Sequence, residues 1–369
     1  MAPAHRWRLF VLPAVLVPIA VALRLGGIPD LAVFAAAGLA VVPLAHLMGL
    51  ATEELSKRAG PGIGGLLNAT MGNATELIIA LVALARAGAE TSAGNPAAAG
   101  RLVEVVKASI TGSIIGNLLL VLGLSILVGG LRHRTQKFSN RAAELQVTLL
   151  VLAIAALVMP ELFQLSYAGA GGARALPNVS AYIAVLLLVA YFVGLVFSLH
   201  THRDVFNPVA HDVEKPVWTR NFALAILVGS TVLVGIVAEI LVSSVESVTA
   251  SLGLTEIFMG VIIIAIVGNA AEHGAAVAMA WKDKMDLTVG IATLSSVQIA
   301  LFVTPVLVLA SLALGPPLTL AFEVFELVAI VLSVAIVAVV AKDGETNWYE
   351  GALLLLVYAI IGVGFFFHP

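Results

Sequence analysis

The sequence contains no cysteine, so it can form neither a disulfide framework nor a thiolate metal site. Charge is also scarce: Asp, Glu, Lys and Arg make up 11% of the 369 residues, whereas soluble domains carry about 25%. The net charge of −3 provides no positive field that would attract a nucleic acid. Hydrophobic residues take the place of the missing charges and make up 60% of the chain. This balance predicts a protein embedded in the lipid bilayer.

Long apolar runs recur along the whole chain. A helix needs about 20 residues to cross the roughly 30 Å hydrocarbon core of a bilayer. We therefore expect an all-α polytopic membrane protein with eleven transmembrane helices, joined by short loops such as "GPG" at 60–62. The first run resembles a signal peptide in length, but Arg24 and Pro29 interrupt the region after it, so we interpret it as a spanning helix. The segments lie near residues 7–25, 31–52, 61–88, 101–130, 141–160, 179–200, 219–250, 254–282, 287–313, 318–341 and 347–367.

The basic residues predict the orientation of these helices. With the N-terminus inside, alternate loops place fourteen of the 19 Lys and Arg residues on the inner side and five on the outer side. Because Lys and Arg concentrate in cytoplasmic loops, we predict a cytoplasmic N-terminus and an external C-terminus. The compact loops are typical of a prokaryotic protein, which favours the cell (inner) membrane over a vacuole.

Two stretches, "MGNATELIIA" at 71–80 and "VGNAAEHGAA" at 267–276, form an internal repeat. A shift of 196 residues superimposes Gly72 on Gly268, Asn73 on Asn269 and Glu76 on Glu272. Each repeat spans five helices, and because five is odd the second copy enters the membrane from the opposite side. Inverted repeats of this kind build many secondary transporters, whose substrate site lies at the midplane between the repeats.

The repeat predicts the organisation of the chain. It divides the sequence into an N-terminal transmembrane helix at 1–30, a first five-helix repeat at 31–200, a cytoplasmic linker at 201–218 and a second, inverted five-helix repeat at 219–369. The linker holds few acidic residues, so we do not expect it to regulate the protein by binding Ca²⁺.

The two glutamates are the chemically unusual residues of the repeat. Glu76 and Glu272 fall near the centres of their predicted helices, where insertion of a charge costs about 2.5–3.5 kcal/mol, so they should face partners or a water-filled cavity. Asn73 and Asn269 precede them by three residues and share their helix face. Glycine beside each Asn can loosen the helix, so that backbone carbonyls turn toward an ion.

The motifs closely resemble those of the cation/proton exchangers, the Ca²⁺/H⁺ antiporters of the calcium/cation antiporter superfamily. The resemblance rests on "GNATE" followed by "SIIGNLLLVLG" at 113–123, and on "GNAAEH" followed by "SSVQIALFV" at 295–303. It covers essentially the whole chain. The Na⁺/Ca²⁺ exchangers share the architecture but usually have Pro before each Glu, where this chain has Thr75 and Ala271. That difference favours the proton-coupled branch.

The resemblance implies a site for Ca²⁺ in which the two glutamates are the main ligands. Neutral oxygens complete it, because Ca²⁺ takes 6–8 oxygen ligands and two carboxylates supply at most four. Ca²⁺ is then a transported substrate, and we expect neither a resident cofactor nor enzymatic activity. The implied site residues are Glu76, Glu272, Asn73, Asn269, Gly72, Gly268, Ser113, Asn117, Ser295 and Gln298.

Four further residues are candidates for a proton relay or the ion path, namely His273, Glu53, Glu239 and Glu246. Glu239 and Glu246 share one helix face and can line an access channel. The structural alternatives are a satisfied core histidine at 273 and a position at the membrane surface for Glu53 and Glu246. Glu323 and Glu326 start a predicted helix, where carboxylates complement the helix dipole, so we assign them that structural role.

The sequence thus predicts a secondary antiporter that exports Ca²⁺ in exchange for H⁺ by alternating access. Two close acids are most easily carried across the membrane with two protons or one Ca²⁺ bound, because the bare dianion is costly to bury. The open alternatives are a Na⁺-coupled or Mn²⁺-preferring exchanger and a passive cation channel. Expected partners are Ca²⁺, H⁺ and the lipid bilayer; a homo-oligomer is possible, and no nucleic acid is expected.

Overall fold

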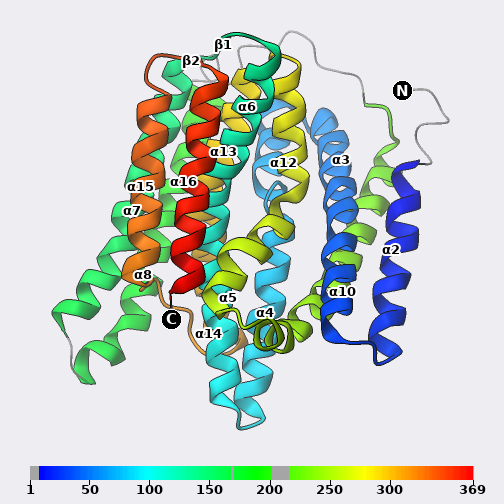
Figure 1. Cartoon of the computed structure of the whole chain (residues 1–369), viewed down its shortest axis with the longest axis vertical. Coiled ribbons are helices and arrows are strands. Elements are labelled where there is room, and N and C mark those ends of the chain that lie inside the picture. The colour runs from blue at the N-terminus through cyan, green and yellow to red at the C-terminus, as the bar shows by residue number, and fades with distance from the viewer. Residues whose placement is uncertain (1–7, 168–169, 202–215, 369) are drawn as a thin grey trace. The chain divides into compact units, whose positions relative to one another are not determined.

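The structure is a computed structural model that describes residues 8–167, 170–201 and 216–368 (Figure 1). The chain forms two compact units. Unit 1 comprises residues 1–83 and 195–256, and unit 2 comprises 84–194 and 257–369. Each unit draws chain from both predicted repeats. The predicted linker at 201–218 and the start of the N-terminal segment lie largely outside the described residues.

Unit 1 is built around two long helices, α3 (Asp30–Met71) and α10 (Arg220–Leu252), which pack along each other. The helix α2 (Arg8–Leu25) packs against both of them, and η2 (Phe197–Thr201), a π-helix, contacts α3. Ala51, Trp218 and Ala223 form a small buried core between α3 and the start of α10. Gly253 ends α10 with a φ of 64°, a left-handed conformation that suits glycine. The helix α4 (Ala74–Ser92) begins in unit 1 and ends in unit 2.

Unit 2 is a bundle of helices closed at one end by a small two-stranded sheet. Its helices are α5 (Pro96–Ile115), η1 (Gly116–Val121), α6 (Leu122–Arg132), α7 (Asn140–Ser166), α8 (Ala170–Val196), α11 (Glu256–Phe258, starting at the unit boundary), η3 (Met259–Ile264), α12 (Ala265–Trp281), α13 (Met285–Gln298), η4 (Ile299–Val303), α14 (Thr304–Leu314), α15 (Val324–Val340) and α16 (Trp348–Phe367). The strands β1 (Gln136–Lys137) and β2 (Glu345–Thr346) pair antiparallel.

This two-stranded sheet carries an exposed ion pair at one end of unit 2. Lys137 Nζ lies 2.6 Å from Glu345 Oε1, and this hydrogen bond raises the pKa of the Lys137 ammonium. Gln136 beside it is buried and donates to Ala280 O at 2.9 Å and to Asp283 Oδ1 at 2.8 Å. The two-stranded sheet is therefore also bound to the turn that follows α12.

Among the described residues, eight helices are long and apolar enough to cross a membrane, and Leu9–Leu25 and Val324–Val340 are shorter apolar helices. The all-α polytopic membrane fold is thereby confirmed, whereas the count of eleven spans stays a prediction. The helix α4 is less apolar because Glu76, Arg86 and Glu90 fall within its 19 residues.

The predicted turn at 60–62 is present, although α3 is assigned as one helix as far as Met71. A Cβ added to Gly64 would overlap the carbonyl oxygen of Ser56, whereas eight residues of straight helix span about 12 Å, so the chain folds back on itself between these two residues. A second break comes at Gly72 and Asn73, and α4 starts at Ala74. The predicted helix at 61–88 is therefore the end of one helix followed by the start of another.

Two π-helical segments occupy equivalent places in the two repeats. A shift of 182 residues carries Ser113 onto Ser295 and η1 onto residues 298–303, which include all of η4. A π-turn contains an extra residue, and such turns occur frequently at functional sites. The segment η4 directly follows Gln298, and η1 contains Asn117, both of which the sequence assigned to the site.

Small residues let α5 and η3 approach closely. A Cβ added to Gly112 would overlap the backbone of Val261, and one added to Gly260 would overlap the Ala108 side chain. Such small-residue contacts bring membrane helices near enough for their backbones to pack. This contact holds α5 beside the segment that leads into α12.

Candidate functional site

Five polar side chains meet inside unit 2. Asn269 on α12 donates from Nδ2 to Ser113 Oγ at 2.9 Å, and its Oδ1 accepts from Asn117 Nδ2 at 3.4 Å. One turn later on the same helix, Glu272 accepts a hydrogen bond from Ser295 Oγ. We call these residues the α12 polar cluster. It joins α12 to α5 and η1 of the first repeat and to α13 of the second.

Helical spacing explains why these side chains converge. Asn269 and Glu272 are three residues apart, and Ser113 and Asn117 are four apart, so each pair shares one helix face. Asn269 Nδ2 also donates to Ala265 O one turn earlier, which fixes the amide orientation. The cluster is therefore held by its own helices as well as by contacts between them.

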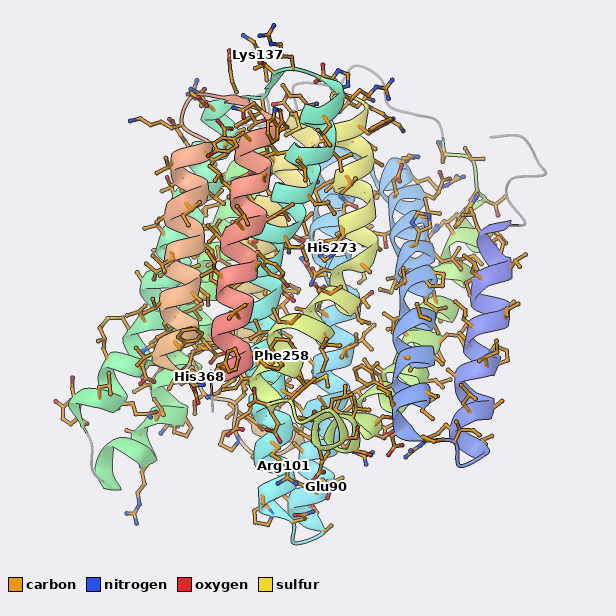
Figure 2. The ribbon with its side chains drawn as sticks, viewed as in Figure 1. Glu90, Arg101, Lys137, Phe258, His273 and His368 are labelled. Atoms are coloured by element: carbon orange, nitrogen blue, oxygen red, sulfur yellow. The ribbon has the colours of Figure 1, made fainter. Side chains whose placement is uncertain are left out.

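The cluster is buried near mid-height of the unit. Ser113, Asn117, Asn269 and Ser295 are each at most 5% exposed, and Glu272 is half-buried. Figure 2 shows His273, the residue after Glu272, about midway between Lys137 at one end and Glu90 and Arg101 at the other. Buried polar groups are costly unless they have partners, so this concentration of amide, hydroxyl and carboxylate groups in an apolar bundle marks a site that can hold a cation.

The corresponding motif of the first repeat lies in unit 1. Asn73 and Thr75 are buried, and Glu76 is half-buried in the first turn of α4. Leu77 N donates to Asn73 O at 3.1 Å, so Asn73 closes the first turn of that helix. Because Asn73 and Glu76 belong to the other unit, their meeting with Glu272 remains a prediction from the repeat.

The two copies of the motif differ in their backbone. Gly72 lies in the turn between α3 and α4, so Glu76 starts a helix, where the dipole favours a carboxylate. Gly268 instead lies within regular α12, and the departure from α-helical geometry comes before it, in η3. Loosening of the helix at the glycine is therefore seen in the first copy only.

The remaining candidates lie in varied surroundings. Gln298 is buried at the end of α13, next to η4. Glu239 and Glu246 are exposed on α10, two turns apart on one face. Glu53 is exposed as well, and one of its carboxylate oxygens lies 2.7 Å from Lys57 Nζ.

Two buried acidic residues outside the predicted set make extensive contacts. Glu54, beside the candidate Glu53, accepts from the backbone N–H groups of Val217 and Trp218 at 2.7 Å each. Glu326 begins α15, and its carboxylate accepts from Glu323 N at 3.0 Å and from Thr111 Oγ1 at 2.9 Å. The capping box of Glu323 and Glu326 confirms their predicted role at a helix start. No sequence signal distinguished Glu54 from Glu53, because only the fold shows which of them meets the chain before α10.

The fold and the cluster define an all-α, polytopic membrane protein with a buried polar site, as in ion transporters. The model of the sodium/calcium exchanger protein family matches residues 30–200 and 222–367, and the chain belongs to this family. A Ca²⁺/H⁺ antiporter from Synechocystis is 43% identical over 384 residues, covering 98% of each chain. The Ca²⁺/H⁺ antiporter ChaA of Bacillus subtilis is 44% identical over 362 residues, covering 97% of this chain and 98% of that protein.

A solved structure shares both sequence and fold with this chain. Native YfkE is 40% identical and superimposes with a TM-score of 0.81, over 98% of this chain and 99% of YfkE. The resemblance to the cation/proton exchangers that the motifs indicated is confirmed by these matches.

Proposed function

We propose that the protein is a secondary antiporter that exports Ca²⁺ from the cytoplasm in exchange for H⁺. The observation that carries this proposal is the α12 polar cluster: a carboxylate, two amides and two hydroxyls buried together within a membrane bundle. The full-length relatives named as Ca²⁺/H⁺ antiporters support the choice of ions. In this scheme Ca²⁺ is the cargo, and the chain acts as a transporter without enzymatic chemistry or a resident cofactor.

The ligands proposed for Ca²⁺ are oxygen atoms from both repeats. Glu272 and Glu76 supply the carboxylates, and Asn269, Asn73 and Ser295 supply neutral oxygens. Hard oxygen ligands suit Ca²⁺, which binds 6–8 of them at about 2.3–2.6 Å. The remaining proposed contributors are Ser113, Asn117, Gln298, Gly72 and Gly268, with water filling any position they leave.

Competition at the carboxylates couples the two ions. A bound Ca²⁺ or a pair of protons neutralises two glutamates, whereas an empty pair leaves two like charges in a poorly hydrated bundle. The protein then changes its access only when one of the two substrates is bound, and this rule makes the exchange obligatory. His273 is proposed to adjust proton transfer at Glu272, while Glu53, Glu239 and Glu246 are proposed to lie along the ion path.

The proposed orientation follows from the basic loops, with the N-terminus in the cytoplasm and the C-terminus outside. The proposed location is the cell (inner) membrane, and a homo-oligomer is compatible with the scheme. Two inverted repeats, at 31–200 and 219–369, would supply the symmetric halves that exchange access.

A Na⁺-coupled exchanger is the second candidate, because the matching family model is described as a sodium/calcium exchanger protein. Against it stand Thr75 and Ala271, which replace the Pro expected before each Glu in Na⁺-coupled relatives. Exchange of Mn²⁺ for H⁺ would use the same oxygen ligands. The preference between Ca²⁺ and Mn²⁺ is therefore set by their relative affinities for this one site.

Flux into proteoliposomes tests the proposal directly. An inside-acid ΔpH should drive uptake of ⁴⁵Ca²⁺, the opposite ΔpH should drive its efflux, and both should persist when the membrane potential is clamped. Replacing ΔpH by a Na⁺ gradient should give little uptake, and competition with Mn²⁺ measures ion preference. Strong Na⁺-driven flux without a ΔpH response would establish the second candidate, whereas flux that ignores both gradients would indicate a channel.

A further inference from the structure

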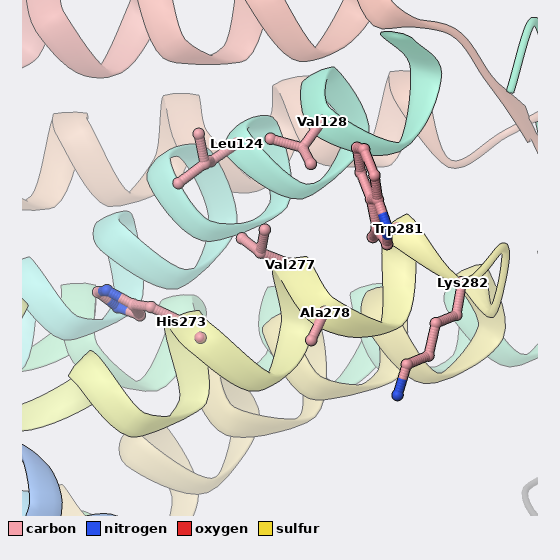
Figure 3. Close-up of a pocket in the computed structure, with 8 residues that line it drawn as sticks. Leu124, Val128, His273, Val277, Ala278, Trp281 and Lys282 are labelled. Atoms are coloured by element: carbon pink, nitrogen blue, oxygen red, sulfur yellow. The ribbon is translucent and has the colours of Figure 1, made fainter. Parts of the chain in front are cut away.

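A groove runs along α12 on the side that faces α6, within unit 2 (Figure 3). It has a volume of about 450 Å³. Leu124 and Val128 line it from α6, and Val277, Ala278 and Trp281 line it from α12. Ala278 and Trp281 are exposed, so the groove opens to the surroundings. It lies beside the α12 polar cluster and includes none of its five residues.

The two ends of the groove differ in chemistry. At one end the guanidinium carbon of Arg132 lies 4.6 Å from the centre of the Trp281 ring, and Arg132 Nη1 donates to Trp281 O at 3.4 Å. Lys282 follows Trp281 and is exposed. His273 lies at the other end, directly after Glu272. The groove is therefore apolar along its length and cationic at one mouth.

The dimensions match one hydrocarbon chain. Eight residues separate His273 from Trp281, which corresponds to about 12 Å of helix, and one leaflet of the hydrocarbon core is about 15 Å thick. A Cβ added to Gly274 would meet no atom within 4 Å, so the groove has free space beside the helix backbone at that level.

Charge decides between the possible occupants. A neutral lipid would use the apolar length alone, and a free phosphate would use the cationic mouth alone, whereas an anionic amphiphile uses both. Two acids that follow Lys282 have their carboxylates oriented by the chain after α6, because Asp283 accepts from Gln136 at 2.8 Å and Asp286 accepts from Ser139 N at 2.7 Å. The cationic mouth also lies on the side predicted to be cytoplasmic, where anionic lipids concentrate.

We propose that this groove binds one anionic phospholipid, with an acyl chain along α12 and its phosphate at Arg132 and Lys282. The chain end then reaches His273, on the side of α12 opposite to the one that carries Glu272 and contacts Ser295. The binding itself depends on neither Ca²⁺ nor protons, so it can be tested apart from the proposed transport.

Native mass spectrometry of the delipidated, detergent-solubilised protein tests the proposal, with phosphatidylglycerol and phosphatidylcholine offered in equal amounts. The wild type should retain one phosphatidylglycerol in at least fivefold preference. The double variant Arg132→Gln/Lys282→Gln should lose this preference. The matched control Arg134→Gln/Lys284→Gln removes the same charge from exposed neighbours that do not line the groove, and it should keep the preference.

A second pair of variants tests the apolar part of the groove. Ala278→Phe should fill it and lower the binding of both lipids, whereas Ala275→Phe, on an exposed position of the same helix outside the groove, should not. Gly274→Leu repeats the test if Ala278→Phe lowers the melting temperature. Brominated phosphatidylglycerol should quench a fluorescence component that Trp281→Phe removes.

Three results would overturn the proposal. The first is equal retention of the two lipids by the wild type. The second is an equal loss in the Arg134→Gln/Lys284→Gln control. The third is a dimer signal that Ala278→Phe abolishes without changing lipid retention, which would make the groove a contact between copies of this chain.

Discussion

At the scale of single residues, the hydrogen bond from Ser295 to Glu272 links the acid to a neighbouring helix. Ser295 therefore orients the carboxylate in addition to offering an oxygen of its own. The adjacent Ser296 is also buried, but its hydroxyl donates to the backbone carbonyl of Ala292 at 3.0 Å. The two serines have the same chemistry, but Ser295 contacts Glu272, whereas Ser296 contacts backbone carbonyls only, including that of Ile114 at 3.4 Å.

Glu272→Gln should abolish Ca²⁺ binding and exchange, because the amide keeps the shape but loses the charge and the exchangeable proton. Ser295→Ala should weaken Ca²⁺ binding by roughly 10-fold, in the range seen when a group that orients a metal ligand is removed. Calorimetric Ca²⁺ titration in detergent measures both effects. Ser296→Ala is the matched control, and an equal loss of affinity in that variant would contradict a specific role for Ser295.

The adjacent acids Glu53 and Glu54 differ in the same way. Glu54→Gln should destabilise the protein by about 1–3 kcal/mol, because one oxygen can no longer accept from the N–H groups of Val217 and Trp218 as a carboxylate does. Glu53→Gln removes only an exposed ion pair, worth about 0–1 kcal/mol. Thermal unfolding in detergent compares them. Transport by Glu53→Gln then reports on the ion path, since that variant should keep its stability.

At the scale of elements, the sequence indicated most helices but misplaced several of their ends: the segment predicted at 179–200 starts nine residues after the start of α8, and the one at 318–341 starts six residues before α15. Apolar length predicts a span reliably because the bilayer sets a minimum length. The break at Gly72 and Asn73 was missed, because these residues lie inside one continuous apolar run of the sequence. The π-helical segments were also unpredicted: hydrophobic periodicity does not show where one extra residue is accommodated.

Close packing of α5 against η3 depends on glycine. Gly112→Ala should lower stability by about 1–3 kcal/mol, since the new Cβ would overlap the Val261 backbone. Gly116→Ala, one turn further along, is the matched control, because a Cβ there meets no atom within 4 Å. Thermal melts of the two variants give the comparison, and similar melting temperatures would show that the helices separate without cost.

At the scale of the whole molecule, the sequence repeat predicted two equivalent halves, whereas the two compact units of the fold do not coincide with the repeats. The helix α3 of the first repeat packs on α10 of the second, so unit 1 contains segments from both repeats. A repeat in one sequence reveals which segments are equivalent, but it does not reveal which of them pack together. Likewise the sequence predicted that Asn269, Ser113 and Ser295 contribute to one site, although it gave no hydrogen-bond partners.

The proposed exchange makes a prediction for the intact protein. Apparent Ca²⁺ affinity should rise with pH, because protons compete with Ca²⁺ for the same carboxylates and become scarcer as pH increases. If two protons leave per Ca²⁺, the logarithm of the affinity should rise by close to two for each pH unit at the acidic end and then level off. Calorimetry in buffers of different ionisation enthalpy counts the released protons. Affinity that is independent of pH, with no proton release, would rule out direct competition.

The division of unit 1 between the two ends of the chain also has a consequence for biosynthesis. Roughly 150 residues lie between the end of α3 and the start of α10, so at about 5–20 residues per second the ribosome needs on the order of ten to thirty seconds to supply the partner helix. Throughout that interval the face of α3 that will contact α10 must be shielded by lipid or by the insertion machinery. The helices α3 and α10 can therefore pair only after both have been inserted. Slowing translation between them should lengthen the time during which membrane proteases can cleave the nascent chain.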